Sequence, residues 1–388
     1  NKDMDTIEAQ RAFLDNSMDN LYNPSLMKDM DKAVDIIIAK IDEGKHIRVI
    51  GDYDIDGICS TYILVKGLQG VGALVSFDIP DRIVDGYGIN ENLIKKAYDE
   101  GVDTIVTCDN GIAAIEQIKY AKELGMTVIV TDHHEVPYVK DETSGQITYK
   151  RVQGDAVINP KQPDCDYPFK LLCGGGIAYK VIQSLYERLA VENKREKIEY
   201  FIEYAAIATI GDVVDLFGEN RIIAANGLKR LQTTANVGLD KLMDMCGINR
   251  ERLSSYHIGF VIGPCLNATG RLETAKKGIE LLMCEDFLEA EKLSSELIEL
   301  NNTTNKNVKY EIVFSEGNVY NANLMYKLKR NNNYIAGNSS EWVNYNGLNL
   351  GTKVLNSKYN DKNVKIHFEG KDNHSSDKEL KICVTTGT

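Results

Sequence analysis

Short apolar runs alternate with longer stretches of helical periodicity between residues 46 and 172. The apolar runs are rich in Val and Ile and have the length of buried strands: 47–51, 73–79, 104–108, 127–131 and 156–158. Between them, apolar residues recur at the spacing of amphipathic helices over 57–69, 90–100 and 112–124. Strands that alternate with helices are typical of parallel βαβ units, so the pattern predicts an α/β fold with a doubly wound, mostly parallel sheet.

The segments that flank this core have other patterns. Residues 1–45 predict a helical lead-in, residues 173–271 predict a largely helical region, and residues 272–305 predict one long connecting helix. Residues 306–388 are rich in Asn, Ser, Lys and Tyr and predict either a small β-rich unit or a partly ordered segment. Three strand-like runs lie there, at 310–314, 364–368 and 380–384.

Length and composition narrow the classes of protein. A chain of 388 residues is too long for one ordinary core and predicts two or three domains. Its eight cysteines form no CxxC pair, which argues against a zinc finger, and its net charge of −12 argues against nucleic-acid binding through a generally basic surface. No apolar run has the length of a membrane span, and the first residues lack the order of a signal peptide, so we expect a cytoplasmic protein with no membrane partner.

Three carboxylates lie close together directly after the first predicted strand: Asp52, Asp54 and Asp56. By itself the stretch from Gly51 to Gly57 is typical of a solvated turn, because Asp and Gly side chains and backbones bond locally there. A site for hard divalent cations uses the same residues, because several anionic oxygens must replace the water stripped from the ion. The choice between the two depends on partners elsewhere in the chain.

Carboxylates and imidazoles also follow other predicted elements. Asp109 comes after the third strand, Asp132, His133 and His134 come after the fourth, and Asp212 ends a predicted helix. In a doubly wound sheet, ligands bind beyond the carboxyl ends of the strands, so these side chains are expected at one edge. Taken alone, the two histidines would be ordinary surface or packed residues, but their place beside the acidic strand ends favours a metal site.

Five of these side chains form a set of oxygen and imidazole donors: Asp54, Asp56, Asp109, His133 and Asp212. Such a mixture suits Mn²⁺ or Mg²⁺ better than a structural Zn²⁺. The set is too large for one catalytic ion and is sufficient for two ions that share a carboxylate, the arrangement that activates water for phosphoester hydrolysis. The sequence therefore predicts a two-metal centre that hydrolyses a phosphodiester.

Groups that bind phosphate are predicted from other loops. Arg82 follows the second strand and Arg271 precedes a helix, and both guanidinium groups can pair with phosphate oxygens. Simple exposure to water would also explain Arg271. Gly174, Gly175 and Gly176 precede another helix and either cradle a phosphate or allow a closely packed helix start.

Five motifs occur in the order typical of one enzyme family: GDYDIDG (51–57), TCDNGI (107–112), DHH (132–134), GDVVDL (211–216) and GPCLNATGRL (263–272). Through them the chain resembles the DHH phosphoesterase superfamily, and within it the single-stranded-DNA-specific exonucleases. The resemblance implies an exonuclease that uses two Mn²⁺ or Mg²⁺ ions and degrades single-stranded DNA from 5′ to 3′, releasing mononucleotides. It also implies a role in DNA repair and recombination, with a helicase or a single-strand-binding protein as partners.

The resemblance further implies roles for individual residues. It places the metal ligands at Asp54, Asp56, Asp109, His133 and Asp212. His134 and Asp132 would support these ligands or supply a proton to the leaving group. Arg82 and Arg271 would bind the phosphates, Arg271 would also offset the charge that grows during the reaction, and Asn267 would shape the pocket.

One part of the family pattern is missing from this sequence. No Gly-Gly-His signature follows residue 305, where the exonucleases have a second α/β domain that forms the other wall of the DNA groove. Two alternatives therefore stand beside the exonuclease. One is a phosphodiesterase for short oligonucleotides or cyclic dinucleotides, and the other is a non-catalytic nucleic-acid-binding subunit.

Overall fold

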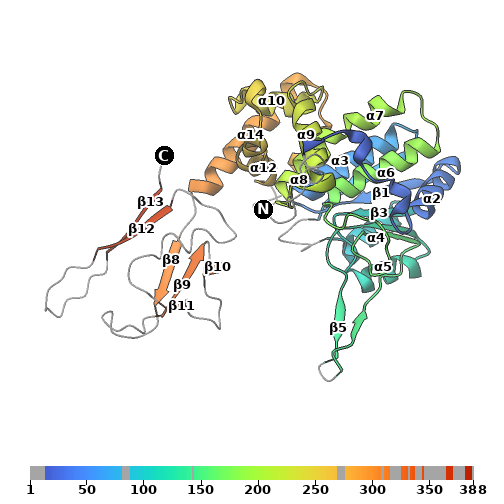
Figure 1. The fold of residues 1–388 in the computed structure, drawn as a ribbon, viewed down its shortest axis with the longest axis horizontal. Coiled ribbons are helices and arrows are strands. Elements are labelled where there is room, and N and C mark those ends of the chain that lie inside the picture. The colour runs from blue at the N-terminus through green and yellow to red at the C-terminus, as the bar shows by residue number, and fades with distance from the viewer. Residues whose placement is uncertain are drawn as a thin grey trace. The chain divides into compact units, whose positions relative to one another are not determined.

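The computed structural model describes residues 14–80, 88–141, 144–268 and 276–306, together with strands between residues 310 and 386. The chain divides into two compact units, residues 1–302 and residues 303–388 (Figure 1). The first unit contains the sheet predicted from the apolar runs, and this sheet positions the candidate site.

Five parallel strands form the central sheet of the first unit, in the order β2-β1-β3-β4-β7. Their bounds are β1 His46–Ile50, β2 Leu74–Asp78, β3 Thr104–Cys108, β4 Thr127–Thr131 and β7 Ala156–Ile158. The prediction of a doubly wound parallel sheet is confirmed. The chain continues from β1 toward one edge of the sheet and from β3 toward the other, so the switch point, where ligands bind in such folds, lies between these two strands.

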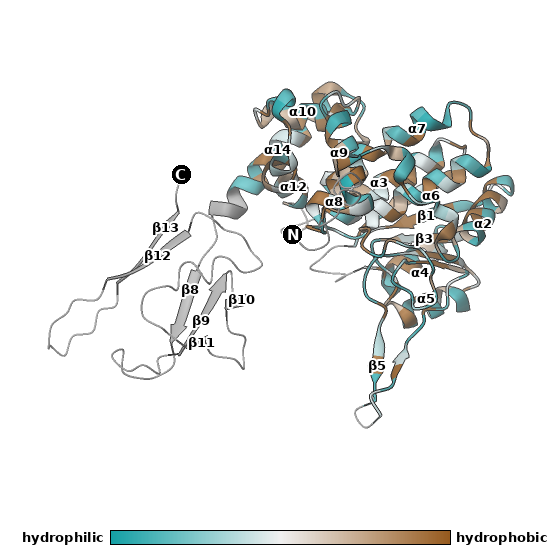
Figure 2. Ribbon diagram, viewed as in Figure 1, coloured by the Kyte–Doolittle hydropathy of each residue, from teal (hydrophilic) through white to brown (hydrophobic). Residues whose placement is uncertain are grey.

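Helices cover both faces of the sheet (Figure 1). On one face pack α2 (Met30–Asp42), α3 (Ile55–Gln69) and α6 (Gly174–Arg188), and on the other pack α4 (Glu91–Asp99) and α5 (Ile115–Glu123). Successive strand residues point to opposite faces, so Val106 joins the first core while Ile105 joins the second. Figure 2 shows the apolar residues gathered where the helices meet the sheet.

The described part of the helical lead-in consists of two short 3-10 turns, η1 (Met18–Asn20) and η2 (Pro24–Leu26), followed by α2. A buried ion pair attaches it to the rest of the unit. Lys180 Nζ lies 2.7 Å from Glu219 Oε1 and donates to the carbonyl of Tyr22 at 2.6 Å. Glu219 also accepts from the backbone N–H of Tyr22 and from the hydroxyl of Tyr167.

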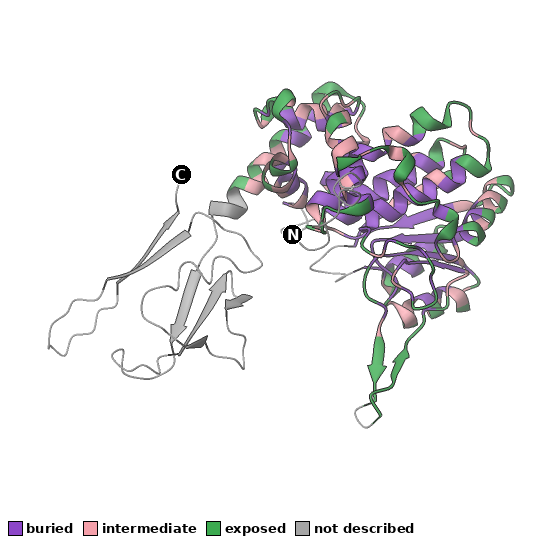
Figure 3. Ribbon diagram, viewed as in Figure 1, coloured by how far each residue is buried: buried purple, intermediate pink, exposed green. Residues whose placement is uncertain are grey.

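The predicted helical region follows β7 and begins with α6. Its elements are α7 (Lys194–Tyr200), α8 (Ile202–Gly211), α9 (Gly218–Leu231), α10 (Val237–Met245), the turn η3 (Arg250–Arg252), α11 (Ser255–His257), the π-helical turn η4 (Ile258–Ile262) and α12 (Gly263–Asn267). Helix α8 packs against α3, α6 and α9 and is buried along nearly its whole length (Figure 3). A helix that is apolar on all sides belongs in a core, and the end of α8 carries Asp212 to the sheet.

The structure corrects the bounds of the connecting helix predicted over residues 272–305. The chain forms two helices there, α13 (Lys276–Met283) and α14 (Phe287–Lys306). The break occurs because Asp286 caps the second helix, with its Oδ1 accepting from the backbone N–H of Glu289 at 2.9 Å.

The second unit is built from antiparallel strands. Their bounds are β8 Tyr310–Phe314, β9 Met325–Arg330, β10 Asn333–Ala336, β11 Val343–Asn344, β12 Val364–Glu369 and β13 Lys381–Thr386. β9 pairs with β8, β10 and β11, and β12 pairs with β13. Three of the strands, β8, β12 and β13, overlap the predicted strand-like runs.

A hairpin not predicted from the sequence joins β4 to β7. Its strands, β5 (Tyr138–Lys140) and β6 (Ile147–Tyr149), are exposed along their whole length and project from the sheet (Figure 1). In the part of the chain that the structure describes, no helix is both long and apolar enough to cross a membrane.

Candidate metal centre

The carboxylates and imidazoles that follow β1, β3 and β4 meet at the switch point of the sheet. The His133 ring is at the centre of the group. Its Nε2 lies 3.0 Å from Asp109 Oδ1, 3.5 Å from Asp56 Oδ2 and 3.9 Å from Asp212 Oδ2. The structure thus brings together three residues that follow strands and Asp212, which follows helix α8, while their role as metal ligands stays a prediction.

Three overlapping sets of donors have ligand atoms close enough to hold a cation. Within each set the atoms lie within 4.8 Å of one another: Asp52, Asp54 and Asp109; Asp109, His133 and His134; Asp56, His133 and Asp212. Asp109 and His133 each belong to two sets. This overlap is what a pair of neighbouring ions with a shared carboxylate requires.

The backbone after β3 turns sharply to aim Asp109 at the centre. Asp109 has a φ of +61°, in the left-handed region that Asp tolerates better than most residues. Asn110 stabilises the turn, because its side-chain amide donates to the carbonyls of Ile50 and Cys108 at 3.1 and 2.9 Å. Asn110 therefore ties the ends of β1 and β3 together, a role that sequence analysis did not assign although the residue lies inside a recognised motif.

Asp56 is held by the start of α6. Its Oδ2 accepts from the backbone N–H of Gly174 and its Oδ1 from that of Gly175, both at 2.7 Å. The N–H of Gly176 donates to Cys173 Sγ at 3.4 Å. All three glycine N–H groups have partners inside the protein, so the alternative of a phosphate cradle is wrong and the closely packed helix start is confirmed.

Close packing explains why glycines are needed at that helix start. A Cβ on Gly174 would lie 2.7 Å from the Cβ of Asp109, and one on Gly175 would lie 2.4 Å from the Cβ of Ala208. Both distances are far below ordinary van der Waals contact. The glycines thus let α6 approach α8 and the metal centre, and the positive end of the α6 dipole favours the negative charge of Asp56.

Asp132 fixes the backbone of both histidines and orients the ring of His134. Its Oδ1 accepts from the backbone N–H of His133 at 2.7 Å, from that of His134 at 3.0 Å and from His134 Nδ1 at 2.8 Å. Its Oδ2 accepts from the backbone N–H of Ile112 at 2.8 Å. Asp132 is buried and fully engaged, so it acts on the centre through the histidines.

The carboxylates of the centre repel one another. Burial and the charge of Asp54 raise the pKa of Asp52 to about 7, and burial with the charges of Asp56 and Asp54 raises the pKa of Asp212 to about 7. The pKa values of Asp54 and Asp109 are raised by burial and by the Asp56 charge. A cation among these groups would offset the cost of burying their charges and the repulsion between them.

The two histidines differ in their proton affinity. Burial lowers the pKa of His133, so its ring is neutral, the form in which imidazole binds metals. The hydrogen bond with Asp132 raises the pKa of His134, whose side chain is 46% exposed. Burial would raise the pKa of Asp132, but its bonds with His134 and with the backbone lower that pKa below the ordinary value.

The donor chemistry fits divalent cations. Within the described residues, the three sets contain only carboxylates and imidazoles and no thiol. Asp52 Oδ1 is buried without a hydrogen-bond partner among those residues, which is costly unless a cation lies nearby. Asp52, left undecided between a turn and a supporting role by sequence analysis, joins the donor set of Asp54 and Asp109.

The predicted roles of three substrate-binding residues stay predictions. Arg82 and Arg271 lie outside the described residues, so their roles stay predictions. Asn267 ends α12, and its Oδ1 is buried without a hydrogen-bond partner among the described residues. Its predicted part in shaping the pocket is untested.

Comparison with known proteins identifies the family. The description "DHH family, N-terminal domain" matches residues 46–211, which include the whole central sheet. A crystal structure of exonuclease RecJ bound to manganese matches with a TM-score of 0.63 and 34% identity, over 72% of this chain and 67% of that one. The chain belongs to the DHH family. The sets of carboxylates and imidazoles described above lie in its DHH domain or, for Asp212, directly after it.

Curated relatives of this DHH protein carry a more specific description. The single-stranded-DNA-specific exonuclease RecJ of Bacillus subtilis is 41% identical over 305 residues, which are 78% of this chain and 36% of the relative. The protein of the same description from Escherichia coli is 32% identical over 303 residues, 75% of this chain and 50% of the relative. The chain thus spans half or less of the length of these relatives.

Proposed function

We propose that this DHH protein is a metal-dependent phosphodiesterase that hydrolyses single-stranded DNA as a RecJ-like exonuclease, from 5′ to 3′, releasing mononucleotides. The observation that carries the proposal is the overlap of donor sets at the switch point, with Asp109 shared. Support comes from the relatives described as single-stranded-DNA-specific exonucleases and from the manganese in the RecJ crystal structure.

The proposed ligands of two Mn²⁺ or Mg²⁺ ions are Asp54, Asp56, Asp109, His133 and Asp212. When bound, two such ions lower the pKa of water and offset the negative charge of the phosphate. The chain's own part is to keep the donors in place. Asp132 holds the backbone of His133, the α6 N-terminus fixes Asp56, and the turn at Asn110 aims Asp109.

His134 is the proposed proton donor to the departing oxygen. Its raised pKa lets the ring hold a proton near neutral pH, and its side chain is exposed enough to meet a substrate. Asp132 keeps the ring oriented by accepting from Nδ1. Arg82 and Arg271 are proposed to bind the phosphates, and Asn267 to shape their pocket.

Hydrolysis of labelled oligonucleotides tests the proposal. With Mn²⁺ we expect the purified chain to release mononucleotides from the 5′ end of a single strand, and with EDTA we expect none. Asp109→Asn keeps the size of the side chain and tolerates the left-handed backbone, and it should lower the rate at least a hundredfold. Asp99→Asn, an exposed carboxylate on α4, is the matched control and should leave the rate unchanged.

The same experiment distinguishes the alternatives. A series of oligonucleotide lengths, with a cyclic dinucleotide, would show a preference for short substrates if the protein is a small-substrate phosphodiesterase. Mn²⁺ binding without turnover of any phosphoester would favour the non-catalytic binding subunit. If Asp109→Asn and the unaltered chain cleave DNA at equal rates, the proposed centre is wrong. Partner proteins of DNA repair, such as a helicase or a single-strand-binding protein, would be sought by co-purification.

A further inference from the structure

A lysine lies beside the metal centre, although a positive charge there weakens cation binding. Lys161 follows β7, whose Ile158 pairs with Thr131 at the end of β4. Asn159 connects it to the centre, because its Oδ1 accepts from the backbone N–H of Lys161 at 2.8 Å and its Nδ2 donates to the carbonyl of His134 at 2.9 Å.

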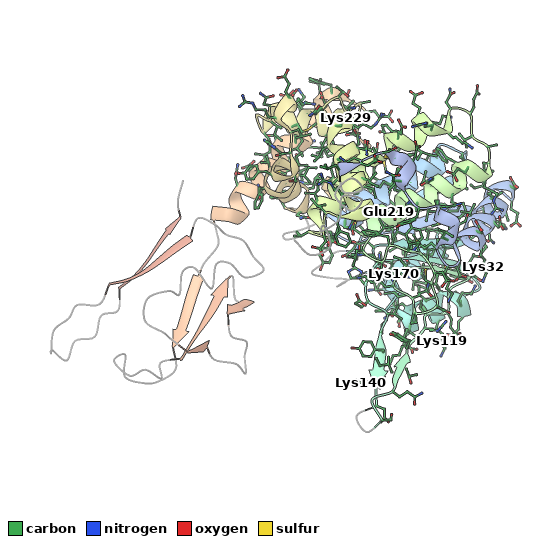
Figure 4. All side chains as sticks on the ribbon, viewed as in Figure 1. Lys32, Lys119, Lys140, Lys170, Glu219 and Lys229 are labelled. Atoms are coloured by element: carbon green, nitrogen blue, oxygen red, sulfur yellow. The ribbon has the colours of Figure 1, made fainter. Side chains whose placement is uncertain are left out.

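Lys161 also lines an open hollow next to the centre. The hollow has a volume of about 410 Å³, in the range of pockets that take small ligands. Lys170 is a second cationic lining residue, Glu135 is the acidic one, and Pro163 and Leu171 supply apolar surface. Figure 4 labels Lys170 on the first unit. A basic, partly apolar hollow beside a phosphodiester-cleaving centre has the chemistry of a nucleotide subsite.

The ion pair of Lys161 does not account for its position. Its Nζ lies 3.0 Å from Glu135 Oε1, but the Glu135 side chain is 82% exposed while that of Lys161 is 21% exposed. An ion pair with so exposed a carboxylate contributes little to stability. Glu135 can turn into water, which leaves the Lys161 ammonium free for another anion at the rim of the centre.

We propose that Lys161, with Lys170, forms a phosphate subsite that binds the internucleotide phosphate next to the one being hydrolysed. The proposal rests on the proposed function, because it assigns the hollow to the same DNA strand. Lys161 would place the strand relative to the metal centre by a charge-assisted hydrogen bond. The repulsion between Lys161 and the cations is then balanced by the phosphate that lies between them.

A merely structural Lys161 makes a different prediction for DNA affinity. If its charge served only to neutralise the carboxylates, its removal would leave DNA binding unchanged. In either role its removal takes away a cation that competes with the metal. Lys161→Met should then bind Mn²⁺ at least as tightly as the unaltered chain and bind DNA more weakly.

Fluorescence anisotropy of a fluorescein-labelled oligothymidylate measures the DNA affinity. Ca²⁺ replaces Mn²⁺ in this titration, so the measurement does not require turnover. We expect Kd to rise about tenfold in Lys161→Met, as for loss of a hydrogen bond between charged groups. Lys119→Met is the matched control, because Lys119 also faces a glutamate, at 3.9 Å, and lies on α5 (Figure 4). It should leave Kd unchanged. Glu135→Gln should lower Kd, because it removes the carboxylate that competes with phosphate for Lys161.

Single methylphosphonate linkages, which are neutral, identify the phosphate. One linkage position should weaken binding about tenfold in the unaltered chain and much less in Lys161→Met. Three outcomes would overturn the subsite. The neutral linkages could weaken binding equally at every position in both proteins, the DNA affinity of Lys161→Met could be unchanged, or that variant could bind Mn²⁺ more weakly. If the unaltered chain cleaves no DNA but still shows the position-specific loss of binding, and Lys161→Met does not, the proposed hydrolysis fails and the subsite stands.

Discussion

Replacing Asp212 by Asn should raise the free energy of unfolding of the metal-free protein. When Mn²⁺ is present, the variant should instead be less stable than the unaltered chain. Asp212 ends α8, with its backbone N–H donating to the carbonyl of Ala208 at 2.8 Å, so the amide side chain can occupy the same place. The substitution removes a negative charge from a group of carboxylates whose repulsion opposes folding.

The size of the effect follows from proton affinity. The pKa of Asp212 is raised from 3.8 to about 7, mainly by burial and by the charge of Asp56. Each tenfold change in proton affinity is worth about 1.4 kcal/mol, which limits the cost of ionising Asp212 in the folded state to about 4 kcal/mol. Because 28% of the side chain is exposed, solvent screening reduces the expected gain to about 1–3 kcal/mol.

The dependence on pH has a definite direction. Below pH 3.8 the carboxyl group is protonated in the folded and unfolded chains alike and contributes no difference. As the pH rises from 3.8 to about 7, the unfolded chain ionises first and the folded state loses stability, and above about 7 the loss is complete. The advantage of Asp212→Asn should therefore be largest at pH 8 and smaller at pH 5.

Urea unfolding followed by circular dichroism measures this advantage, with EDTA present to remove metal. Asp215→Asn is the matched control, because Asp215 belongs to the same motif and is exposed. With Mn²⁺ at a thousand times its Kd, binding adds about 4.1 kcal/mol to the unaltered chain, which exceeds the expected gain of the variant, so the order of stability should reverse. A metal-free Asp212→Asn protein that is less stable at pH 8 would refute the repulsion on which the metal centre is argued.

Three further substitutions test the supports of the centre. Asp132→Asn should lower Mn²⁺ affinity about 10–100-fold in a calorimetric titration, because the amide lacks the negative charge and its NH2 group cannot accept from the backbone N–H of Ile112; an unchanged affinity would contradict this role. Gly175→Ala should lower the free energy of unfolding by about 1–3 kcal/mol in urea and weaken Mn²⁺ binding as well, because its Cβ would push α6 away from Ala208 and Asp56. Glu219→Gln should cost about 3–5 kcal/mol by leaving the buried Lys180 charge without its partner, with no change in Mn²⁺ affinity; a stability loss below about 1 kcal/mol would show that the pair is not needed.

The sequence was most informative about the sheet and the residues at its carboxyl edge. Apolar runs of strand length allow little choice of fold, and parallel strands bring whatever follows them to one edge. The meeting of Asp56, Asp109 and His133 could therefore be predicted from their places after three strands. Asp212 was harder, because it ends a helix, and its position near His133 depends on the packing of α8.

The missed features depend on contacts between distant residues or on local capping. The bonds from Gly174 and Gly175 to Asp56 join residues 118 and 119 positions apart, and no local pattern tells a carboxylate partner from a phosphate. Asn110 supports two strand ends through carbonyls that any residue would supply. The break before α14 depends on one carboxylate, Asp286, which helical periodicity alone does not register.

Two helix starts are directed at the same group of carboxylates, and this explains how the fold tolerates them. Asp54 caps α3, because its Oδ1 accepts from the backbone N–H of Gly57 at 3.0 Å, while Asp56 accepts from the start of α6. Each helix N-terminus carries a partial positive charge that favours an ionised carboxylate nearby. These two partial charges stabilise the two aspartates nearest the switch point, whereas Asp212 lies at the carboxyl end of α8, where the dipole disfavours a negative charge. The two helix starts therefore help the fold to tolerate the repulsion among the carboxylates, whereas Asp212 has no helix start to offset its charge, which is why its substitution is a sharp test of the centre.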